Sequence, residues 1–312
     1  MVRLAGIGLI LFALNVVGGV SHPRAKAKRV TAKADLLRVQ VLLDQGHFSP
    51  GEIDGHYGGV TRAAIRAFQA AHRLAQTGTL NQATLRALEP EQQSVPTSVP
   101  YTISDDDVAG PFTTVPNDLM EQAKLDKLSY QSPLEELSEK FHCSPKLLQR
   151  LNPDKDFSKA GEQILVPNIH GDMPLKAASV VVSKSKSTVK ALDAKGKVLS
   201  EYPATIGSTH DPLPIGNWRV THVTRDPIFY YNPNLFWNAP GSDTKATIQA
   251  GPNNPAGVVW IGLTKEHYGI HGTPEPSLIG HVQSHGCIRL TNWDAAELAG
   301  MVSKGTPVIF RR

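Results

Sequence analysis

The stretch 178–202, ASVVVSKSKSTVKALDAKGKVLSEY, decides the fold of the C-terminal part of the chain. Its polar and apolar residues alternate with a period of two and a Lys-Gly pair interrupts them, which is typical of strands joined by a turn. The segments GNWRVTHV, GVVWIGL, YGIHG and TPVIF continue the pattern. Only 292–305, NWDAAELAGMVSKG, reads as a clear helix, with Asn292 as its candidate N-cap. We therefore expect residues 176–312 to form a mainly β domain of catalytic size.

Residues 32–90 read as a small three-helix domain. Two amphipathic helices, ADLLRVQVLLDQG and VTRAAIRAFQAAHRL, flank the turn SPGEIDGHYGG, and TGTLNQATLRAL supplies the third. The stretch 51–88 closely resembles the peptidoglycan-binding domain that pairs a Gly-x-Ile-Asp-Gly turn with a Thr-Arg-x-Ala-Ile-x-x-Phe-Gln helix. The resemblance implies binding of cell-wall glycopeptide; a helical bundle without a ligand is the alternative. The residues bordering the turn, which either contact a ligand or only shape the fold, are Asp54, Gly55, Tyr57, Thr61 and Arg62.

A second small unit is expected at 118–169, after a linker at 91–117 that is rich in Pro, Ser and acidic residues and has little periodicity. The order helix, helix, strand follows from LEELSEKF, CSPKLLQRLNP and AGEQILVPN. This pattern resembles a LysM domain, which implies glycan binding. The usual opening strand of that domain, with Gly-Asp-Thr-Leu, is replaced here by YQSPLEEL. The whole chain is thus expected to be multidomain α+β.

The 312 residues carry a net charge of +4 and a pI near 9.0, and no Lys/Arg run is long enough to predict a nucleic-acid surface. Near the N-terminus the uncharged apolar run LAGIGLILFALNVV is followed by small residues and then a basic stretch. This order is typical of a secretory signal peptide, here 1–21. An uncleaved anchor is the alternative, although the run is short for a membrane span. The protein is therefore expected to be exported, to the periplasm or cell wall.

The stretch 281–292, HVQSHGCIRLTN, gathers two histidines, a glycine and one of the two cysteines of the chain. Cys287 can serve as a nucleophile if a nearby imidazole or a cluster of amides favours its ionisation. His271 and His285 are the candidate bases. Consecutive amides around Gly286 can form a nest for an oxyanion, and Arg289 is placed to pair with a substrate carboxylate.

Two alternatives to thiol catalysis stay open on residue types alone. The stretch can be an ordinary turn, or part of a zinc site, although no His-x-x-x-His or Cys-x-x-Cys spacing supports zinc. The zinc ligands would come from His271, His285 and Cys287, with His267 or His281. A disulfide is not expected, because Cys143 and Cys287 lie 144 positions apart in segments of different kinds.

The stretch 268–298 closely resembles the catalytic signature of the L,D-transpeptidases. That signature is a His-Gly-Thr, a spacer, Ser-x-Gly-Cys-Ile-Arg followed by Met or Leu, and an Asn; here twelve residues separate His271 from Ser284. DPLPIGNWRV and AGPNNPAGVVWIGL also fit the family, with Leu213 where threonine is common. The resemblance spans nearly all of 177–312. It implies a β-rich catalytic domain that acts on peptidoglycan stem peptides and is susceptible to carbapenems.

By this resemblance Cys287 is the nucleophile and His271 is the general base, which the carbonyl of Gly272 orients. The amides of His285, Gly286 and the nucleophile would form the oxyanion hole. In relatives the position of His285 also holds other residues, so its ring is not expected to be the base. The implied substrate-binding residues are Arg289, Ser284 and Tyr268. The resemblance implies neither a metal nor a cofactor.

The implied reaction begins when the thiolate attacks the third residue of a stem tetrapeptide and expels D-alanine. A side-chain amine of a second stem then resolves the thioester and gives a 3–3 cross-link. Water as acceptor would make the protein an L,D-carboxypeptidase, and a protein lysine would make it anchor a lipoprotein. A zinc amidase and a non-catalytic cell-wall-binding protein are alternatives of other classes. The expected partners are stem peptides, glycan strands and, for the anchoring reaction, a lipoprotein, without nucleic acid or a stable protein partner.

Two further expectations concern the surroundings of the site. The long segment 225–254 is rich in Pro, Asn and Gly and is predicted to form a lid beside Cys287. The aromatic residues expected to contact a ligand are Phe229, Tyr230, Tyr231, Phe236 and Trp237. The two N-terminal units are expected to raise the local substrate concentration through a flexible tether rather than to take part in the chemistry.

Overall fold

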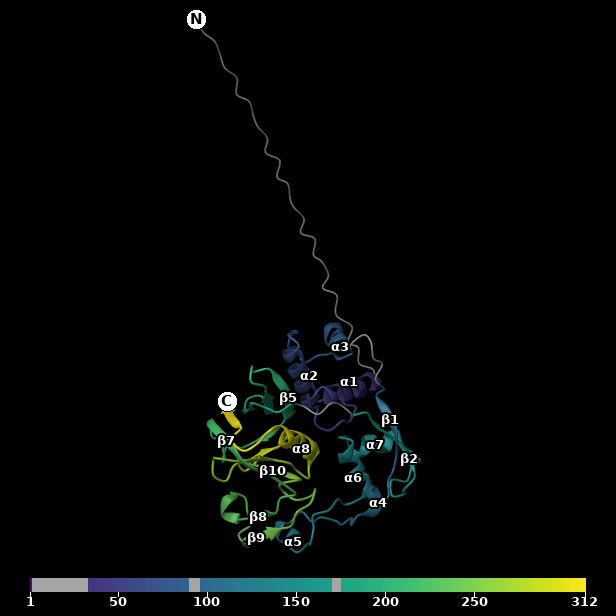
Figure 1. Ribbon diagram of the computed structural model, residues 1–312, viewed down its shortest axis with the longest axis vertical. Helices are drawn as coiled ribbons and strands as arrows, with labels where there is room; N and C mark the ends of the chain where they lie inside the picture. The colour runs from purple at the N-terminus through teal and green to yellow at the C-terminus, as the bar shows by residue number, and fades with distance from the viewer. Residues whose placement is uncertain (2–32, 90–95, 170–174) are drawn as a thin grey trace.

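A computed structural model describes residue 1 and residues 33–89, 96–169 and 175–312 of the chain (Figure 1). The expected signal peptide at 1–21 lies almost wholly outside these residues. Within them, none of the helices is both long and apolar enough to cross a membrane.

The first unit contains the three expected helices. They are α1 (Lys33–Gln45), α2 (Gly59–Ala71) and α3 (Gln82–Leu88). Their apolar faces meet around Leu43, Ile65 and Phe68, and the ring of Phe48 packs edge-on against Phe68 at 5.6 Å. The apolar spacing in α2 therefore buries one face of this helix, as expected for an amphipathic helix on a small core.

The middle unit contains two paired strands with four short helices between them in the chain. In chain order its elements are β1 (Ser98–Thr102), α4 (Asp106–Ala109), α5 (Leu119–Gln122), α6 (Pro133–Lys140), α7 (Pro145–Leu151) and β2 (Gln163–Pro167). β1 is antiparallel to β2. The segment 91–117, expected to be a linker, thus contains the partner strand β1 and the short helix α4. The segment YQSPLEEL begins α6 instead of a strand, because Ser132 caps the amide of Glu135 at 3.2 Å and Pro133 occupies the first turn.

The C-terminal domain is built on a nine-stranded sheet with the order β5-β4-β3-β13-β7-β10-β11-β12-β6. In chain order the strands are β3 (Ser179–Ser183), β4 (Thr188–Leu192), β5 (Val198–Pro203), β6 (Thr205–Ile206), β7 (Gly216–Arg225), β10 (Val259–Leu263), β11 (Gly269–His271), β12 (Ile288–Arg289) and β13 (Pro307–Arg311). β8 (Phe229–Tyr231) and β9 (Ala246–Ile248) form a separate hairpin. The short 3₁₀ helices are η1 (Pro233–Leu235) and η2 (Pro276–Leu278). The alternation in 178–202 thus produced the strands that it predicted.

The helix α8 (Asn292–Met301) follows the stretch that contains Cys287 and packs against the sheet core through Ala295, Leu298 and Met301. Its N-cap is Thr291, whose hydroxyl accepts from the amide of Asp294 at 3.2 Å, so the expected cap at Asn292 is wrong by one residue. The shift frees the Asn292 side chain for other contacts.

Both N-terminal units pack directly against the start of α8 (Figure 1). Ser49 of the first unit donates to the Asp294 carboxylate at 2.9 Å. The imidazole of His142, from the middle unit, stacks on Trp293 with ring centroids 5.3 Å apart and planes 10° apart. The two units are therefore docked on the catalytic domain, which differs from the expected flexible tether. Freely tethered units would leave Ser49, Asp294, His142 and Trp293 in contact with water instead of with one another.

Candidate active site

One face of the sheet carries side chains from four adjacent strands. Thr224 on β7 pairs with Trp260 on β10. Trp260 also pairs with His271 on β11, and His271 pairs with Arg289 on β12. Directly paired residues of neighbouring strands point to the same face of a sheet, so these four side chains share a surface. Their neighbour Ile270 points the other way, into the apolar core.

Cys287 reaches the same face from the turn that precedes β12. Gly286 adopts a φ of +102°, and a Cβ there would lie 3.1 Å from the hydroxyl of Tyr268, so glycine suits both the backbone and the space. Cys287 is two residues before Arg289, and both side chains line one cavity with His271. The Cys287 thiol is half-buried and lies 3.6 Å from the carbonyl of His267.

The imidazole of His271 is held in one tautomer. It is only 5% exposed, and its Nδ1 lies 2.7 Å from the carbonyl of Gly272. Because a carbonyl only accepts, Nδ1 carries the proton and Nε2 keeps a lone pair. Trp260 stacks on the ring, with centroids 5.3 Å apart. Burial, and secondarily the Arg289 guanidinium, lower the pKa of His271 to about 3, so the ring is neutral at rest.

The thiol is also neutral at rest. Burial raises the pKa of Cys287 above its ordinary value, although the amide of Gly269 and the Arg289 guanidinium favour the thiolate. A neutral thiol and a neutral imidazole that line one cavity are the two groups that general-base activation of a nucleophile requires. The two pKa shifts therefore argue against a resting thiolate–imidazolium pair.

The second histidine faces the lid. His285 Nε2 lies 2.6 Å from Asn238 Oδ1, and the ring lies 4.8 Å from that of Phe236 and 5.4 Å from that of Trp237. Burial, then Arg289, lower the pKa of His285. The His285 ring thus makes its hydrogen bond to Asn238 in the predicted lid, whereas the His271 ring makes its hydrogen bond to the backbone carbonyl of Gly272.

The expected substrate-binding residues divide into two groups. Tyr268 and Arg289 line the cavity, and the Nε of Arg289 is buried without a hydrogen-bond partner in the part of the chain that the structure describes. An unpaired buried donor is costly, which makes it a natural partner for a ligand acceptor. Ser284 does not line the cavity, because it is only 2% exposed. Its hydroxyl donates to the Cys287 carbonyl at 2.6 Å and so stabilises the turn.

The cavity above these residues has a volume of about 1150 Å³. The predicted lid forms one wall, since Phe229, Tyr230, Tyr231 and Phe236 all line it. Trp237 instead stacks on His210 at 4.5 Å. A wall that the sequence did not predict comes from residues 117–119 of the middle unit. Among the described residues, no three His, Cys, Asp or Glu side chains converge as metal ligands would.

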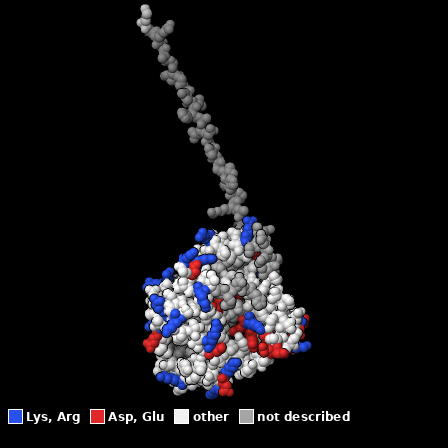
Figure 2. Space-filling view, viewed as in Figure 1, with Lys and Arg blue, Asp and Glu red and all other residues white. Residues whose placement is uncertain are grey.

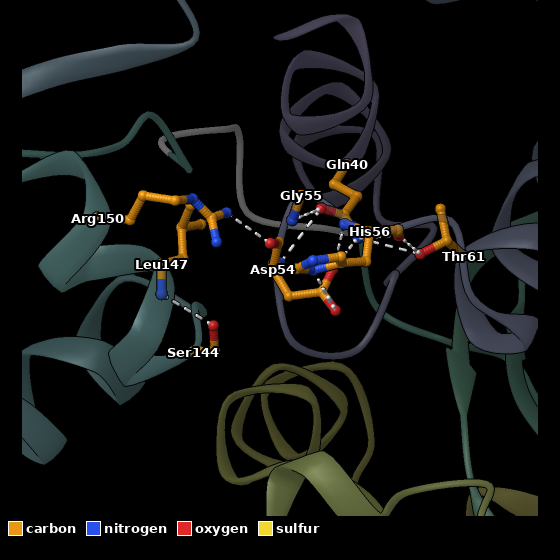
Figure 3. A network of polar contacts seen from close by, with 8 residues as sticks. All are labelled: Gln40, Asp54, Gly55, His56, Thr61, Ser144, Leu147 and Arg150. Atoms are coloured by element: carbon orange, nitrogen blue, oxygen red, sulfur yellow. Dashed lines mark hydrogen bonds and ion pairs between the residues drawn. The ribbon is translucent and has the colours of Figure 1, made fainter. Parts of the chain in front are cut away.

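The residues bordering the turn of the first unit are engaged with one another (Figure 3). Gln40 donates to Asp54 Oδ1 at 2.8 Å and to the Thr61 hydroxyl at 3.0 Å, and its oxygen accepts from the Gly55 amide at 2.7 Å. Arg150 of α7 donates to the Asp54 carbonyl at 2.9 Å, which ties the turn to the middle unit. These contacts give the turn residues a structural role in this chain.

Two further turn residues also make internal contacts. Tyr57 donates to the carbonyl of Gly78, and the Arg62 guanidinium lies 5.3 Å from the centre of the Tyr57 ring. A pocket of about 90 Å³ adjoins the turn, with the loop that contains η2 on its other side. The face shown in Figure 2 has no continuous basic stripe.

Comparison with known proteins matches the first unit and the C-terminal domain to two known families. The L,D-transpeptidase catalytic domain family matches residues 177–310, and the family described as "Putative peptidoglycan binding domain" matches residues 33–88. The protein "Putative L,D-transpeptidase YkuD" of Bacillus licheniformis is 31% identical over 179 residues, which cover 56% of this chain and 91% of that protein. Its namesake in Bacillus subtilis is 28% identical over 190 residues, covering 59% and 99%.

A crystal structure of an L,D-transpeptidase from Xylanimonas cellulosilytica covers 88% of this chain and 92% of its own, with 18% identity and a TM-score of 0.38. The identity and coverage of the Bacillus licheniformis relative, together with the two family matches, settle the assignment. The chain belongs to the L,D-transpeptidase family, as an enzyme whose mainly β catalytic domain follows a helical peptidoglycan-binding domain.

Proposed function

We propose that this enzyme is exported and makes 3–3 cross-links in peptidoglycan through a thioester on Cys287. The observation that supports this proposal most strongly is the strand register that directs His271 and Arg289 to one sheet face, in one cavity with Cys287. A nucleophile, a neutral base and a cation for a substrate carboxylate are then within one site.

In the first half-reaction His271 Nε2 takes the thiol proton as sulfur attacks the carbonyl carbon of the third stem residue. Amides of the turn at His285, Gly286 and Cys287 face the developing oxyanion. The tetrahedral intermediate collapses to a thioester, and the imidazolium gives its proton to the nitrogen of the departing D-alanine. Arg289 pairs with a substrate carboxylate.

In the second half-reaction the side-chain amine of another stem attacks the thioester carbon. His271 removes a proton from the attacking nitrogen and returns it to the sulfur, which leaves as thiol. One peptide bond has then been exchanged for another, so no external energy source is needed. With water as acceptor the product would be a tripeptide, and with a protein lysine it would be an anchored lipoprotein.

The middle unit is proposed to be LysM-like and to bind glycan. Its support is that α6, α7 and β2 follow one another in the expected helix–helix–strand order. β1, which precedes them with the short helices α4 and α5 between, pairs antiparallel with β2. Together with the peptidoglycan-binding domain, it would hold the enzyme on the cell wall. Glycan strands would then be its partner in addition to stem peptides.

Mass spectrometry after incubation with a disaccharide-tetrapeptide tests the cross-linking reaction. A dimer whose mass lacks one D-alanine, formed by the wild-type enzyme and absent with Cys287→Ala, is expected. Monomeric tripeptide as the sole product would instead assign the enzyme to the carboxypeptidases. Adding a lysine-terminated lipoprotein peptide to the same reaction tests the anchoring alternative, which predicts a tripeptide–protein adduct.

A further inference from the structure

We propose that Glu139, on α6 of the middle unit, is a positioning residue for the catalytic domain and acts on His271 through Asn292. The inference rests on the proposed role of His271 as the base. Glu139 is 9% exposed, and its two carboxyl oxygens lie 2.9 Å and 3.2 Å from the side-chain nitrogen of Asn292. The first residue of α8 is thus held by a carboxyl group from another unit.

The Asn292 amide is wedged between two backbone segments of the catalytic domain. Its oxygen accepts from the amide of Val258 at 3.2 Å, and its nitrogen also donates to the Pro252 carbonyl at 3.1 Å. A Cβ added at Gly257 would lie 2.1 Å from this oxygen, and one added at Gly272 would lie 2.2 Å from it. Only glycine at both positions leaves room for the amide, so the three residues form one close-packed unit.

Both backbone segments touch the proposed base. The Gly272 carbonyl accepts the Nδ1 proton of His271 at 2.7 Å, and the backbone carbonyl of Ala256 also favours the protonated ring. A shift of the Asn292 amide therefore shifts the carbonyl acceptors that fix the tautomer and the orientation of the His271 ring. Catalytic groups need to be held within about 0.5 Å, and a displacement of about 1 Å can cost about 100-fold in rate.

The chemistry of the contact is unusual for simple packing. Among the residues that the structure describes, no cation pairs with the Glu139 carboxyl. The titratable groups around it are Tyr130, whose hydroxyl lies 3.5 Å away, and the carboxyls of Glu135 and Glu52. Burial raises the pKa of Glu139 to about 8. Burying a carboxyl group without a cation costs desolvation free energy, and an apolar side chain would join the two domains without that cost. Its oxygens do, however, orient the Asn292 amide.

The test compares acylation by a carbapenem in the full chain carrying Glu139→Leu, Glu139→Gln, or the matched control Glu136→Gln. Glu136 is on the same helix and half-buried, and within the described part of the chain it makes no hydrogen bond to Asn292. Adduct formation is followed by intact mass, and reversible binding is separated from the acylation rate constant by varying the carbapenem concentration. We expect Glu139→Leu to lower the rate constant by about 10- to 100-fold with little change in binding. Glu139→Gln, which keeps an acceptor, should recover most of it.

A second readout follows the base itself. In ¹⁵N spectra of the imidazoles, the wild type should show His271 as the Nδ1-protonated neutral form, and Glu139→Leu should show exchange between tautomers. Unchanged acylation and an unchanged tautomer in folded Glu139→Leu would overturn the inference. If Glu139→Leu does not fold, Glu139→Asp, which shortens the side chain by one methylene, takes its place with the same expectations. Failure of the wild type to acylate would count against the proposed function instead.

Discussion

His271 and Arg289 are directly paired across the parallel strands β11 and β12, so their side chains leave the sheet on the same face. This relationship explains how a proposed base can lie far in sequence from the proposed nucleophile. Cys287 lies two positions before Arg289 and opens on the same cavity, whereas the nearer histidine, His285, makes its polar contact with Asn238 of the lid.

The low pKa of His271 predicts an unusual pH profile. Because burial and Arg289 lower this pKa to about 3, the ring stays neutral, and able to accept a proton, as the pH falls from 7 to 5. The rate constant for acylation by a carbapenem should therefore change little between pH 7 and pH 5. A solvated histidine base would lose activity with a midpoint near 6.5. A midpoint near that value would mean that water reaches His271.

Stability should fall as the pH rises from 6.5 to 8.5. Burial raises the pKa of Asp294 to about 8 and that of Glu139 to about 8, whereas both groups titrate near 4 in an unfolded chain. The folded state thus binds more protons in this window, and it loses the resulting stability as the pH passes through 8. His271 acts in the opposite direction only near pH 6.5, where the imidazole of the unfolded chain is still partly protonated, and adds nothing above about pH 7.5.

Melting temperatures at pH 6.5 and pH 8.5 measure this effect. Asp294→Asn keeps an acceptor for Ser49 and should melt with a smaller difference between the two pH values than the wild type. An exposed acid of the same chain, Glu266, provides the control as Glu266→Gln, which should leave the difference unchanged. A melting temperature that rises with pH in the wild type would refute the assignment of raised carboxyl pKa values to this junction.

The lid is expected to depend on the middle unit. Leu128 is fully buried and packs with Tyr231 and Ile248 of the lid hairpin, and its amide donates to the Ala250 carbonyl at 3.0 Å. Leu128→Ala should destabilise this small core by about 2–5 kcal/mol. Because the core joins the lid to the middle unit, hydrogen exchange at 229–248 should speed up more than in β3. Equal changes in both segments would indicate global destabilisation instead.

The local patterns predicted much of this molecule. Period-two alternation predicted the strands, and the glycine stop after α1 and the turn at Asp54 predicted the first unit. Of the residues that the family resemblance implied, His271, Arg289 and Tyr268 line the cavity with Cys287, whereas Ser284 does not. These features depend on residues close in sequence or on a strand register that alternation fixes.

The contacts between units could not be predicted in the same way. β1 contains Pro100 and lies in a stretch of linker-like composition, and it becomes a strand only because β2, some sixty positions later, pairs with it. The wall at 117–119 and the contact of Glu139 with Asn292 likewise join residues far apart in the chain. Such pairings leave no local periodicity, so a single sequence carries no signal for them.

The acylation rates of Cys287→Ala, His271→Ala and His285→Ser test the central claim most directly. Intact-mass measurement of the carbapenem adduct over time gives the rate for each folded variant. Cys287→Ala should form no adduct, and His271→Ala should lose about 10²–10⁴-fold in rate, as general-base catalysis is removed. His285→Ser should lose far less, because its ring contacts the lid. If His285→Ser were as inactive as His271→Ala while still folded, the assignment of His271 as the sole base would be wrong.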